Sequence, residues 1–290
     1  MQLDFTQRWD QRRSRWIAHR ATLDPERFTV RVIREDLAHG FCEVDHYAGS
    51  LGAVRLPVGL FERGGAGDEQ LVGACVFGVL LQPRAAERWC GQDAGVVPEL
   101  HRLCLLDRAP FNAESFFVAR AIRLLRERMP KARALLSYAD PVPRYDAGGQ
   151  VTKFGHVGTC YQALSMRFTG TSSARTLIVD REGRVLSERS LSKLRNGERG
   201  ARYAERQLID SGAPSRRPLE EPRAYVARAL REGPFRQFRH PGNLVYALAL
   251  DDSADTRARL APARPYLTRA ELGLSPQGLR AEPSAECAGA

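Results

Sequence analysis

The chain has 290 residues, of which 43% are hydrophobic and 27% charged, as is usual for a globular protein with one large domain or two small ones. No apolar run approaches the roughly 20 residues of a membrane helix, and Asp4, Arg8 and Asp10 interrupt the N-terminus where a signal peptide would be apolar. We therefore expect a cytoplasmic protein without a membrane partner. The six cysteines form no CxxC pair, so neither a zinc ribbon nor a redox dithiol is indicated.

The positive charge is concentrated in one part of the chain. The formal net charge is +10, and residues 181–240 hold 15 Lys and Arg against 8 Asp and Glu, a local net charge of +7. Such a segment favours a polyanionic partner, because cationic side chains bind phosphates and release their counterions. The alternative is that the arginines only reflect a GC-rich genome.

Periodicity predicts both helices and strands in the first half of the chain. Residues 1–22 have the pattern of a polar amphipathic helix. Alternating residues or continuous Val-rich runs predict strands over 28–34, 54–61, 71–81 and 99–106, the middle two forming a hairpin. A helix with Asn112 as its N-cap and Pro130 as its end follows, and then a buried strand over 134–139.

The second half is predicted to contain shorter elements. These are a helix over 155–164, a strand over 166–169, a hairpin over 176–189, helices over 190–210 (interrupted near Asn196) and 222–232, and a strand over 244–250. The residues from 255 to 290 lack periodicity and are expected to be largely disordered. The expected organisation is a catalytic domain over 1–175, a basic subdomain packed on it over 176–250, and a tail over 251–290.

The element order across residues 99–170 resembles the GNAT acetyltransferase fold. That resemblance implies an α/β (α+β) fold with a mixed central sheet flanked by helices, and a basic C-terminal extension. It also implies that acetyl-CoA or a related acyl donor binds the loop 107–115, where a helix N-terminus offers unpaired N–H groups. The usual Gly-rich loop is absent, and Pro110 removes an N–H donor. A generic α/β layer whose loop binds nothing is the alternative.

Several short motifs, taken together, resemble the phage Mom family. They are His46-Tyr47, Glu99-Leu-His-Arg-Leu103, Asn112 with Ser115, Ser137-Tyr-Ala-Asp140, Gly155-His-Val-Gly-Thr-Cys-Tyr-Gln-Ala163, and Arg239-His-Pro-Gly-Asn243 with Tyr246. The resemblance implies an enzyme that acts in a bacterial host cell on double-stranded DNA. It would place a carbamoylmethyl group on the N6 amine of adenine and protect phage DNA from restriction nucleases.

The resemblance implies that His46, Tyr47, Ser137 and Asp140 are catalytic. His46 is a candidate general base because its unperturbed pKa lies near neutrality. Asp140, at the end of a central strand, is expected to accept a proton from the amine or to bind it; its alternative is a turn residue beside Pro141. Ser137 and Tyr138 point to opposite faces of the strand and are not expected to share a pocket unless the strand bends.

A second set of residues is expected to bind the acyl donor: Arg108, Asn112, Ser115, His156 and Tyr161. For His156 the alternative is helix capping, and for Tyr161 a place in the core. Glu99 and Arg102 are expected to face the cleft or each other. A metal held by His46, Asp140 and His156 is a weaker alternative, because these residues have no short ligand spacing.

Lys193, Arg195, Arg199 and Arg202 are expected to contact DNA phosphates; the alternative is a solvated helix face. An adenine inside a duplex must be flipped out to react, and Phe111, Tyr138 or Phe168 is expected to stack on it. Two other functions stay open: a GNAT-like acyltransferase for another amine, such as an aminated thymine in phage DNA or a small molecule, and a non-catalytic nucleic-acid-binding protein. Plain acyl transfer would give an N-acetyl group, so a carbamoylmethyl product requires a further nitrogen source or a rearrangement.

Overall fold

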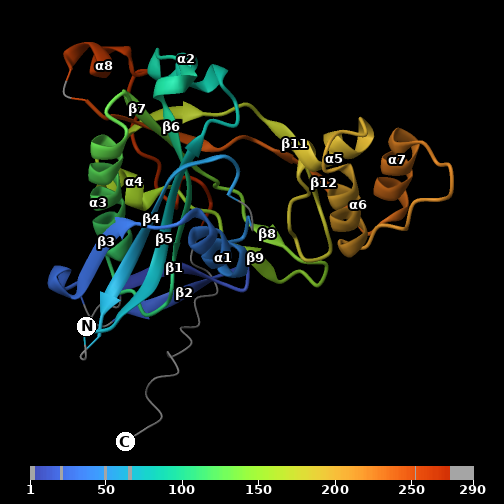
Figure 1. The fold of residues 1–290 in the computed structure, drawn as a ribbon, viewed down its shortest axis with the longest axis horizontal. Helices are drawn as coiled ribbons and strands as arrows, with labels where there is room; N and C mark the ends of the chain where they lie inside the picture. Colours follow the sequence, from blue (N-terminus) through green and yellow to red (C-terminus); the bar gives the residue numbers. More distant parts are fainter. Residues whose placement is uncertain (1–3, 20–21, 49–50, 65–66, 252, 275–290) are drawn as a thin grey trace, which may run out of the picture. The chain divides into compact units, whose positions relative to one another are not determined.

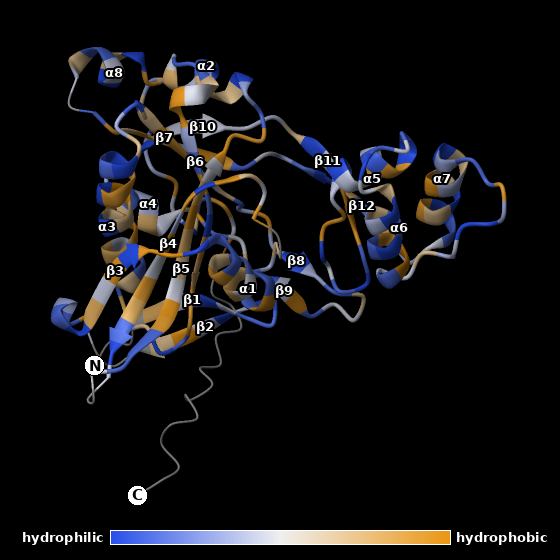
Figure 2. Cartoon of the chain, in the orientation of Figure 1, coloured by the Kyte–Doolittle hydropathy of each residue, from blue (hydrophilic) through white to orange (hydrophobic). Residues whose placement is uncertain are grey.

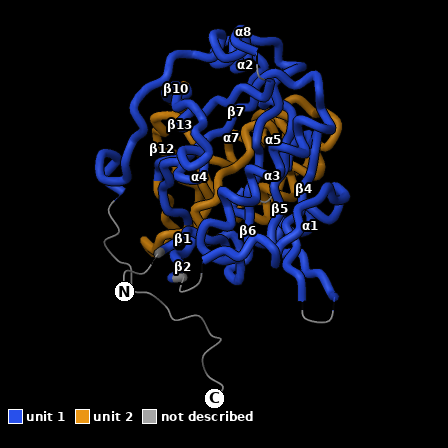
Figure 3. The backbone as a smooth tube through the Cα atoms, turned by 90° about the vertical axis from the view of Figure 1, so that its left-hand side faces the viewer, with its two compact units in different colours: residues 1–142, 153–172, 243–290 blue, residues 143–152, 173–242 orange. Residues whose placement is uncertain are grey.

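The computed structural model describes residues 4–19, 22–48, 51–64, 67–251 and 253–274. The chain divides into two compact units (Figure 3). Unit 1 consists of residues 1–142, 153–172 and 243–290, and unit 2 of residues 143–152 and 173–242. The basic segment expected over 176–250 therefore corresponds largely to unit 2, but its last strand belongs to unit 1. Within the described ranges, no helix is both long and apolar enough to cross a membrane.

Seven strands of the described residues form one mixed sheet in unit 1 (Figure 1). In spatial order they are β10 (Arg167–Thr171), β13 (Leu244–Ala249), β7 (Ala134–Ala139), β6 (Pro98–Leu105), β5 (Glu69–Val79), β4 (Val54–Arg63) and β3 (Phe28–Val32). Neighbours are antiparallel except for β6 and β7, which run parallel.

Helices cover both faces of this sheet. Residues of α3 (Ala113–Arg128) and α4 (Thr159–Ala163) share one apolar cluster with inward residues of the strands. On the other face lie α1 (Glu35–Asp45) and α2 (Arg84–Cys90). The strands are apolar along most of their length because both of their faces are covered (Figure 2). The expected mixed α/β fold and its element order over 99–170 are confirmed.

Residues 4–19 form a hairpin, so the helix predicted over 1–22 is wrong for them; residues 1–3 lie outside the described residues. Strand β1 (Asp4–Asp10) pairs antiparallel with β2 (Arg13–His19). Gln11 and Arg12 join them with φ angles of 46° and 66°, as a two-residue turn with two left-handed positions requires. The usual Asn-Gly signal is missing from this turn, so the local sequence does not indicate a hairpin.

The segment after β13 is ordered as far as the structure describes it, contrary to expectation. It contains α8 (Ala254–Arg259), and Leu260 and Leu274 are buried. Backbone hydrogen bonds join Ala261 N to Trp89 O at 2.9 Å and Arg264 N to Phe168 O at 2.8 Å. Apolar side chains at wide spacing attach this segment to the sheet without regular periodicity. Residues 275–290 lie outside the described residues.

Unit 2 contains α5 (Glu188–Arg195), α6 (Ala201–Asp210) and α7 (Pro222–Glu232) around their own apolar cluster. Strand β11 (Arg175–Val179) pairs with β12 (Arg236–His240), and β8 (Arg144–Tyr145) pairs with β9 (Val151–Lys153). The predicted hairpin around residues 180–183 is confirmed only as a short turn, in which Val179 and Val185 form an isolated antiparallel bridge and Leu186 N donates to Ile178 O at 2.8 Å. The main partner of β11 is β12, which comes from a distant part of the sequence. Short 3-10 turns occur at Pro25–Arg27 and Ala94–Val96.

Candidate functional site

The parallel strands β6 and β7 separate toward their carboxyl ends. Their register joins Glu99 to Leu136 and Leu100 to Ser137, although β6 continues to Leu105 and β7 to Ala139. A pocket of about 270 Å³ opens where this pairing stops, and Leu100, Leu103 and Tyr138 line it. This volume lies just below the about 300–1,000 Å³ of typical ligand pockets, so it suits a compact group.

The β1–β2 hairpin supplies one wall of the pocket, a wall that sequence analysis missed. Gln7, Trp9 and Trp16 line the pocket together with Tyr47. The Trp9 and Tyr47 rings lie 4.7 Å apart between centroids, at an interplanar angle of 35°. The alternation of Phe5, Gln7 and Trp9 along the sequence was the signal that could have identified this strand.

Arg8 anchors the hairpin to the beginning of α3. Its side chain is 1% exposed and forms an ion pair with Glu114. The same guanidinium donates to the carbonyl oxygen of Ala109 at 3.0 Å. The buried cation thus holds the loop before α3 against the hairpin, and both elements then line one pocket.

His46 lies at the C-cap of α1 and lines the pocket. Its Nδ1 accepts a hydrogen bond from the backbone N–H of Ala48 at 3.1 Å. In the neutral ring the proton is therefore on Nε2, which makes His46 a hydrogen-bond donor at that nitrogen. This tautomer differs from the general base that the sequence suggested, because a base needs an unprotonated nitrogen toward its substrate.

His156 has the opposite tautomer. Its Nε2 accepts from the backbone N–H of Asp140 at 3.3 Å, so the proton of the neutral ring is on Nδ1. A second bond, from His156 N to Asp140 O at 3.0 Å, fixes the same two residues. His156 lines the pocket, as expected of a donor-binding residue, and Asp140 determines where it lies.

Asp140 itself is not among the pocket-lining residues. It is 4% exposed, and its Oδ2 lies 3.3 Å from Nζ of Lys153, which is 1% exposed. Its Oδ1 accepts from the N–H of Val142 at 3.0 Å, which is the turn geometry that the alternative interpretation described. In this arrangement Asp140 positions its neighbours, and the expected meeting of its carboxylate with the reacting amine stays a prediction.

Ser137 also lies outside the pocket lining. It is fully buried on β7, opposite Tyr246 of β13. The adjacent Tyr138 does line the pocket, as alternation along a strand requires. Burial raises the pKa of Tyr138, and the nearby Glu99 raises it further, so the phenol stays protonated.

The loop 107–115 reaches the pocket through part of its length. Asn112, at the N-cap of α3 with φ 69°, lines the pocket beside Ser115. The hydroxyl of Ser115 donates to the carbonyl oxygen of Asn112 at 3.1 Å. Arg108 does not line the pocket, because Glu62 of β4 binds its Nε at 2.8 Å. The expected use of Arg108 for a pyrophosphate stays a prediction, with Glu62 as a competing partner.

Tyr161, Arg269 and His101 also line the pocket. Tyr161 lies on α4 as expected, its ring 5.4 Å from that of Tyr246. Arg269 comes from the segment expected to be disordered, and its guanidinium lies 4.4 Å from the centre of the Trp16 ring. No ion pair of Arg269 occurs among the described residues.

His101 was noticed only as part of a motif. Its Nδ1 lies 2.8 Å from Leu51 O and its Nε2 2.9 Å from Val79 O, so the ring bridges two backbone segments. Burial lowers the pKa of His101 below its usual value. Glu99, expected to face the cleft, does not line it; burial raises the pKa of its carboxyl to about 7.

Two further groups of predicted residues do not join this pocket. In the described part of the chain, no three or more His, Cys, Asp or Glu residues are grouped to hold a metal ion, so His46, Asp140 and His156 form no such group. The four residues expected to bind DNA lie in unit 2, on α5, on α6 and between them. Of the aromatic residues expected to stack on a base, Phe111 and Tyr138 line the pocket and Phe168 is buried in the core.

The comparisons with solved structures found several enzymes of low identity. A tandem GNAT protein from the clavulanic acid biosynthesis pathway is 10% identical, with 78% of this chain and 99% of that chain covered and a TM-score of 0.40. An N-acetyltransferase from Staphylococcus aureus Mu50 is 14% identical, with 52% of this chain and 87% of that chain covered and a TM-score of 0.29. A malonyl-CoA decarboxylase from Agrobacterium vitis is 12% identical, with 87% of this chain and 68% of that chain covered and a TM-score of 0.33. Among curated proteins, no match was found.

The comparison with protein families gave one match, to the model of the Mom protein family, over residues 27–221. The match begins just before β3 and ends just before α7, so it includes the splayed strand pair, the loop before α3, His156 and the α5–α6 pair. Since it spans well over half of the chain, this protein belongs to the Mom protein family.

Proposed function

We propose that this protein modifies adenine in DNA at the exocyclic N6 amine, adding a carbamoylmethyl group, and that this protects phage DNA from restriction. The observation that carries the proposal is the combination of aromatic and amide side chains in the pocket of unit 1. Trp9 and Tyr47 offer ring faces on which a flipped base can stack. Gln7 and Asn112 carry the carboxamide groups that pair with an adenine edge.

The size of the pocket supports the same reading. About 270 Å³ accommodates a base and a small transferred group rather than a complete carrier molecule. An acyl donor such as acetyl-CoA would therefore place only its acyl end here. Leu100 and Leu103 provide apolar surface for that end.

The charged part of a donor would meet Arg269 rather than Arg108. Arg108 is engaged by Glu62 and Gln70, and Pro110 removes one N–H from the loop. Arg269 lines the pocket with no carboxylate partner among the described residues, so its charge is available for a phosphate. Asn112 and Ser115 lie at the start of α3, where the helix dipole favours an anion.

The two pocket histidines would act as donors of hydrogen bonds. His46 through Nε2 and His156 through Nδ1 can bind a carbonyl oxygen, and donors aimed at developing negative charge stabilise it. The carbamoylmethyl group is attached through its CH2, so its nitrogen must come from a second source besides an acyl donor. The pocket residues named here bind, orient and exclude water, and they do not supply that nitrogen.

The test is the chemical state of DNA in cells that make the protein. Plasmid DNA from an expressing bacterium is digested to nucleosides and examined by mass spectrometry. We expect a deoxyadenosine heavier by one carbamoylmethyl group, and we expect it to disappear in Trp9→Ala. Arg123→Gln, an exposed change on α3 away from the pocket lining, is the matched control and should keep the product.

Unmodified deoxyadenosine from a folded wild-type protein would contradict the proposal. A shifted thymine-derived nucleoside or a modified small amine would then favour the acyltransferase alternative. Duplex binding without any modified product would favour a non-catalytic DNA-binding protein.

A further inference from the structure

Helices α5 and α6 of unit 2 form a short helix–turn–helix. They are joined by residues 196–200, in which Gly197 and Gly200 have φ angles of 62° and 91°. Only glycine adopts these angles without strain, so both positions fix the turn. Buried Leu191 and Leu194 of α5 pack with Ala204 and Leu208 of α6, which sets which side of α6 faces outward.

The outward side of α6 is basic and aromatic. One face of α6 carries four exposed residues at helical spacing: Arg202, Tyr203, Arg206 and Gln207. Tyr203 is 61% exposed. Gln207 Nε2 donates to the Tyr203 hydroxyl at 3.1 Å, so these two side chains are held together. Polar residues predominate along this helix in Figure 2.

The arginines of this face differ from those of α5 in their partners. Arg195 of α5 is bound by Glu188 at 2.5 Å, and Lys193 is half-buried. Among the described residues, Arg199, Arg202 and Arg206 form no ion pair with a carboxylate. Three arginines without an ion-pair partner therefore stand at or on one helix, which also carries Glu205 and Asp210. The wider segment 181–240 has a net charge of +7, and this field favours a polyanion.

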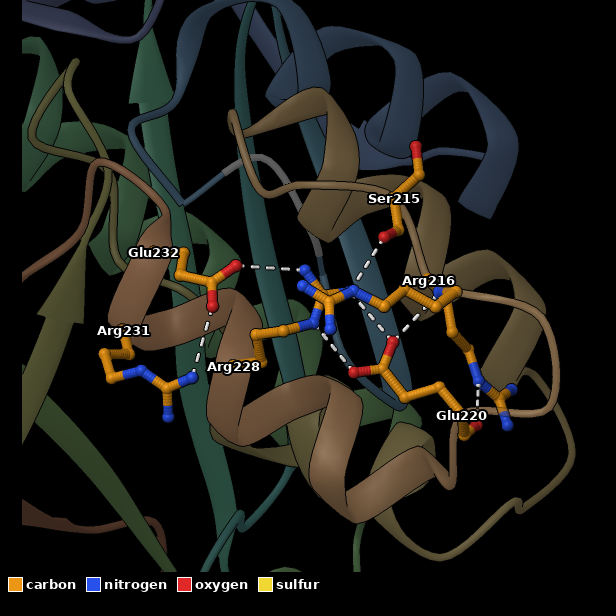
Figure 4. A network of polar contacts seen from close by, with 7 residues as sticks. Ser215, Arg216, Glu220, Arg228, Arg231 and Glu232 are labelled. Carbon is orange, nitrogen blue, oxygen red and sulfur yellow. Dashed lines mark hydrogen bonds and ion pairs between the residues drawn. The ribbon is translucent and has the colours of Figure 1, made fainter.

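The connection between α6 and α7 is held by a network around Arg228 of α7 (Figure 4). Arg228 Nε and Nη2 donate to the two carboxylate oxygens of Glu220 at 2.7 and 2.8 Å, and Nη2 also donates to Ser215 O at 2.9 Å. Bidentate pairs of this kind fix geometry as well as adding energy. The connection between α6 and α7 is thus tied to α7, and α6 packs with α5 and α7 in one apolar cluster.

We propose that α6 is a recognition helix that enters the major groove of duplex DNA. In helix–turn–helix proteins the second helix lies in the groove and its N-terminal residues reach base edges, while the first helix crosses the backbone. Arg199, Arg202 and Arg206 bind phosphates or guanine edges, and Gln207 reads adenine through its carboxamide. The choice of DNA as partner rests on the proposed function; the assignment to α6 rests on the geometry of unit 2.

The experiment measures binding of the full chain to a labelled DNA duplex by fluorescence anisotropy at several salt concentrations. Arg202→Gln/Arg206→Gln should lower the affinity at least about 10-fold and reduce the slope of log K against log salt by about 2, because two phosphate contacts are lost. Arg123→Gln/Arg231→Gln removes the same charge from α3 and α7 and should leave the slope unchanged. Gln207→Ala should leave the slope unchanged. It should reduce the ratio of the affinities for the tightest-binding duplex and for an unrelated duplex by roughly 5- to 150-fold.

An unchanged salt slope in the α6 double variant, or an equal loss in the control, would overturn the assignment. So would an equal loss of affinity for single-stranded DNA and for duplex, since a single strand has no major groove. The outcome is separable from that of the proposed function. Duplex binding through α6 together with unmodified adenine would refute the proposed modification and support the assignment of α6. Modified adenine together with an unchanged salt slope in the α6 double variant would support the modification and refute the assignment.

Discussion

Asp140 and Lys153 form a buried ion pair in which Oδ2 and Nζ are 3.3 Å apart. Lys153 Nζ also donates to the carbonyl oxygens of Asp140 and Val142, each at 3.0 Å. The pair therefore closes the chain on either side of the insertion between residues 142 and 153. It also holds His156, through the backbone of Asp140, against the pocket.

Breaking the ion pair between Asp140 and Lys153 should strongly lower the free energy of unfolding. Lys153→Met leaves the Asp140 carboxylate buried without its cation, and Asp140→Ala leaves the ammonium; each should lower the free energy of unfolding by about 3–5 kcal/mol. The double variant should lose clearly less than the sum of the two, because no unpaired charge remains. Urea denaturation of all four proteins gives the coupling energy. Additive losses would show that the pair does not act as a unit.

His46 should act as a donor of a hydrogen bond. His46→Gln places an amide N–H near the position of Nε2, whereas His46→Asn keeps the acceptor for Ala48 but lacks that donor. We expect the glutamine variant to keep measurable adenine modification and the asparagine variant to lose about 10²- to 10³-fold in rate. The rate of modified-nucleoside formation in a time course measures this. An equal loss in both variants, neither of which can accept a proton, would support the general-base role.

Glu99 should make the protein less stable as the pH rises. Burial raises the pKa of its carboxyl from 4.5 to about 7, so the folded state holds the proton more tightly than the unfolded chain does. The contribution of protonated Glu99 to the free energy of unfolding is complete below pH 4.5. It is lost as the pH rises to about 7, and the loss amounts to at most about 3 kcal/mol. Glu99→Gln should remove this dependence.

Unfolding in urea at pH 5 and at pH 8 measures the effect. The free energy of unfolding of Glu99→Gln, measured relative to the wild type, should be higher at pH 8 than at pH 5. Glu87→Gln, an exposed change on α2, should show no such shift. Equal differences at both pH values would mean that Glu99 is not the group that titrates.

Two arginines of the hairpin, Arg8 and Arg15, should contribute very differently to the free energy of unfolding. Arg8 is 1% exposed against Glu114, whereas Arg15 and its partner Asp107 are 43% and 34% exposed. Arg8→Met should cost about 3 kcal/mol or more, because Glu114 and two loop carbonyls lose their cation. Arg15→Met should cost less than about 1 kcal/mol, because solvent screens an exposed pair.

Limited proteolysis gives a second readout of the same change. Cleavage within residues 4–19 should become faster in Arg8→Met and stay near the wild-type rate in Arg15→Met. Because the hairpin supplies Gln7, Trp9 and Trp16 to the pocket, adenine modification should fall in the first variant only. Equal behaviour of both variants would contradict the anchoring role of Arg8.

The sequence by itself determined the order of the central elements. The Val-rich run of β5, the apolar face of α3 and Pro130 after it are local signals, and local signals survive without knowledge of the fold. The motif residues also identified His46, Tyr47, Asn112, Ser115, His156 and Tyr161, all of which line one pocket. Residues far apart in the chain meet there because the carboxyl ends of neighbouring parallel strands lie at one edge of the sheet.

Tertiary structure alone decided the rest. The β1–β2 hairpin has an atypical turn, and its stability depends on Arg8 reaching a partner more than one hundred residues away. The tautomers of His46 and His156 follow from single backbone N–H groups, and the role of Asp140 follows from burial beside Lys153. Arg269 reaches the pocket because Leu260 and Leu274 attach an aperiodic segment to the sheet. Such long-range pairings leave no periodic trace in a sequence, since they depend on where the chain returns and not on the residues next to them.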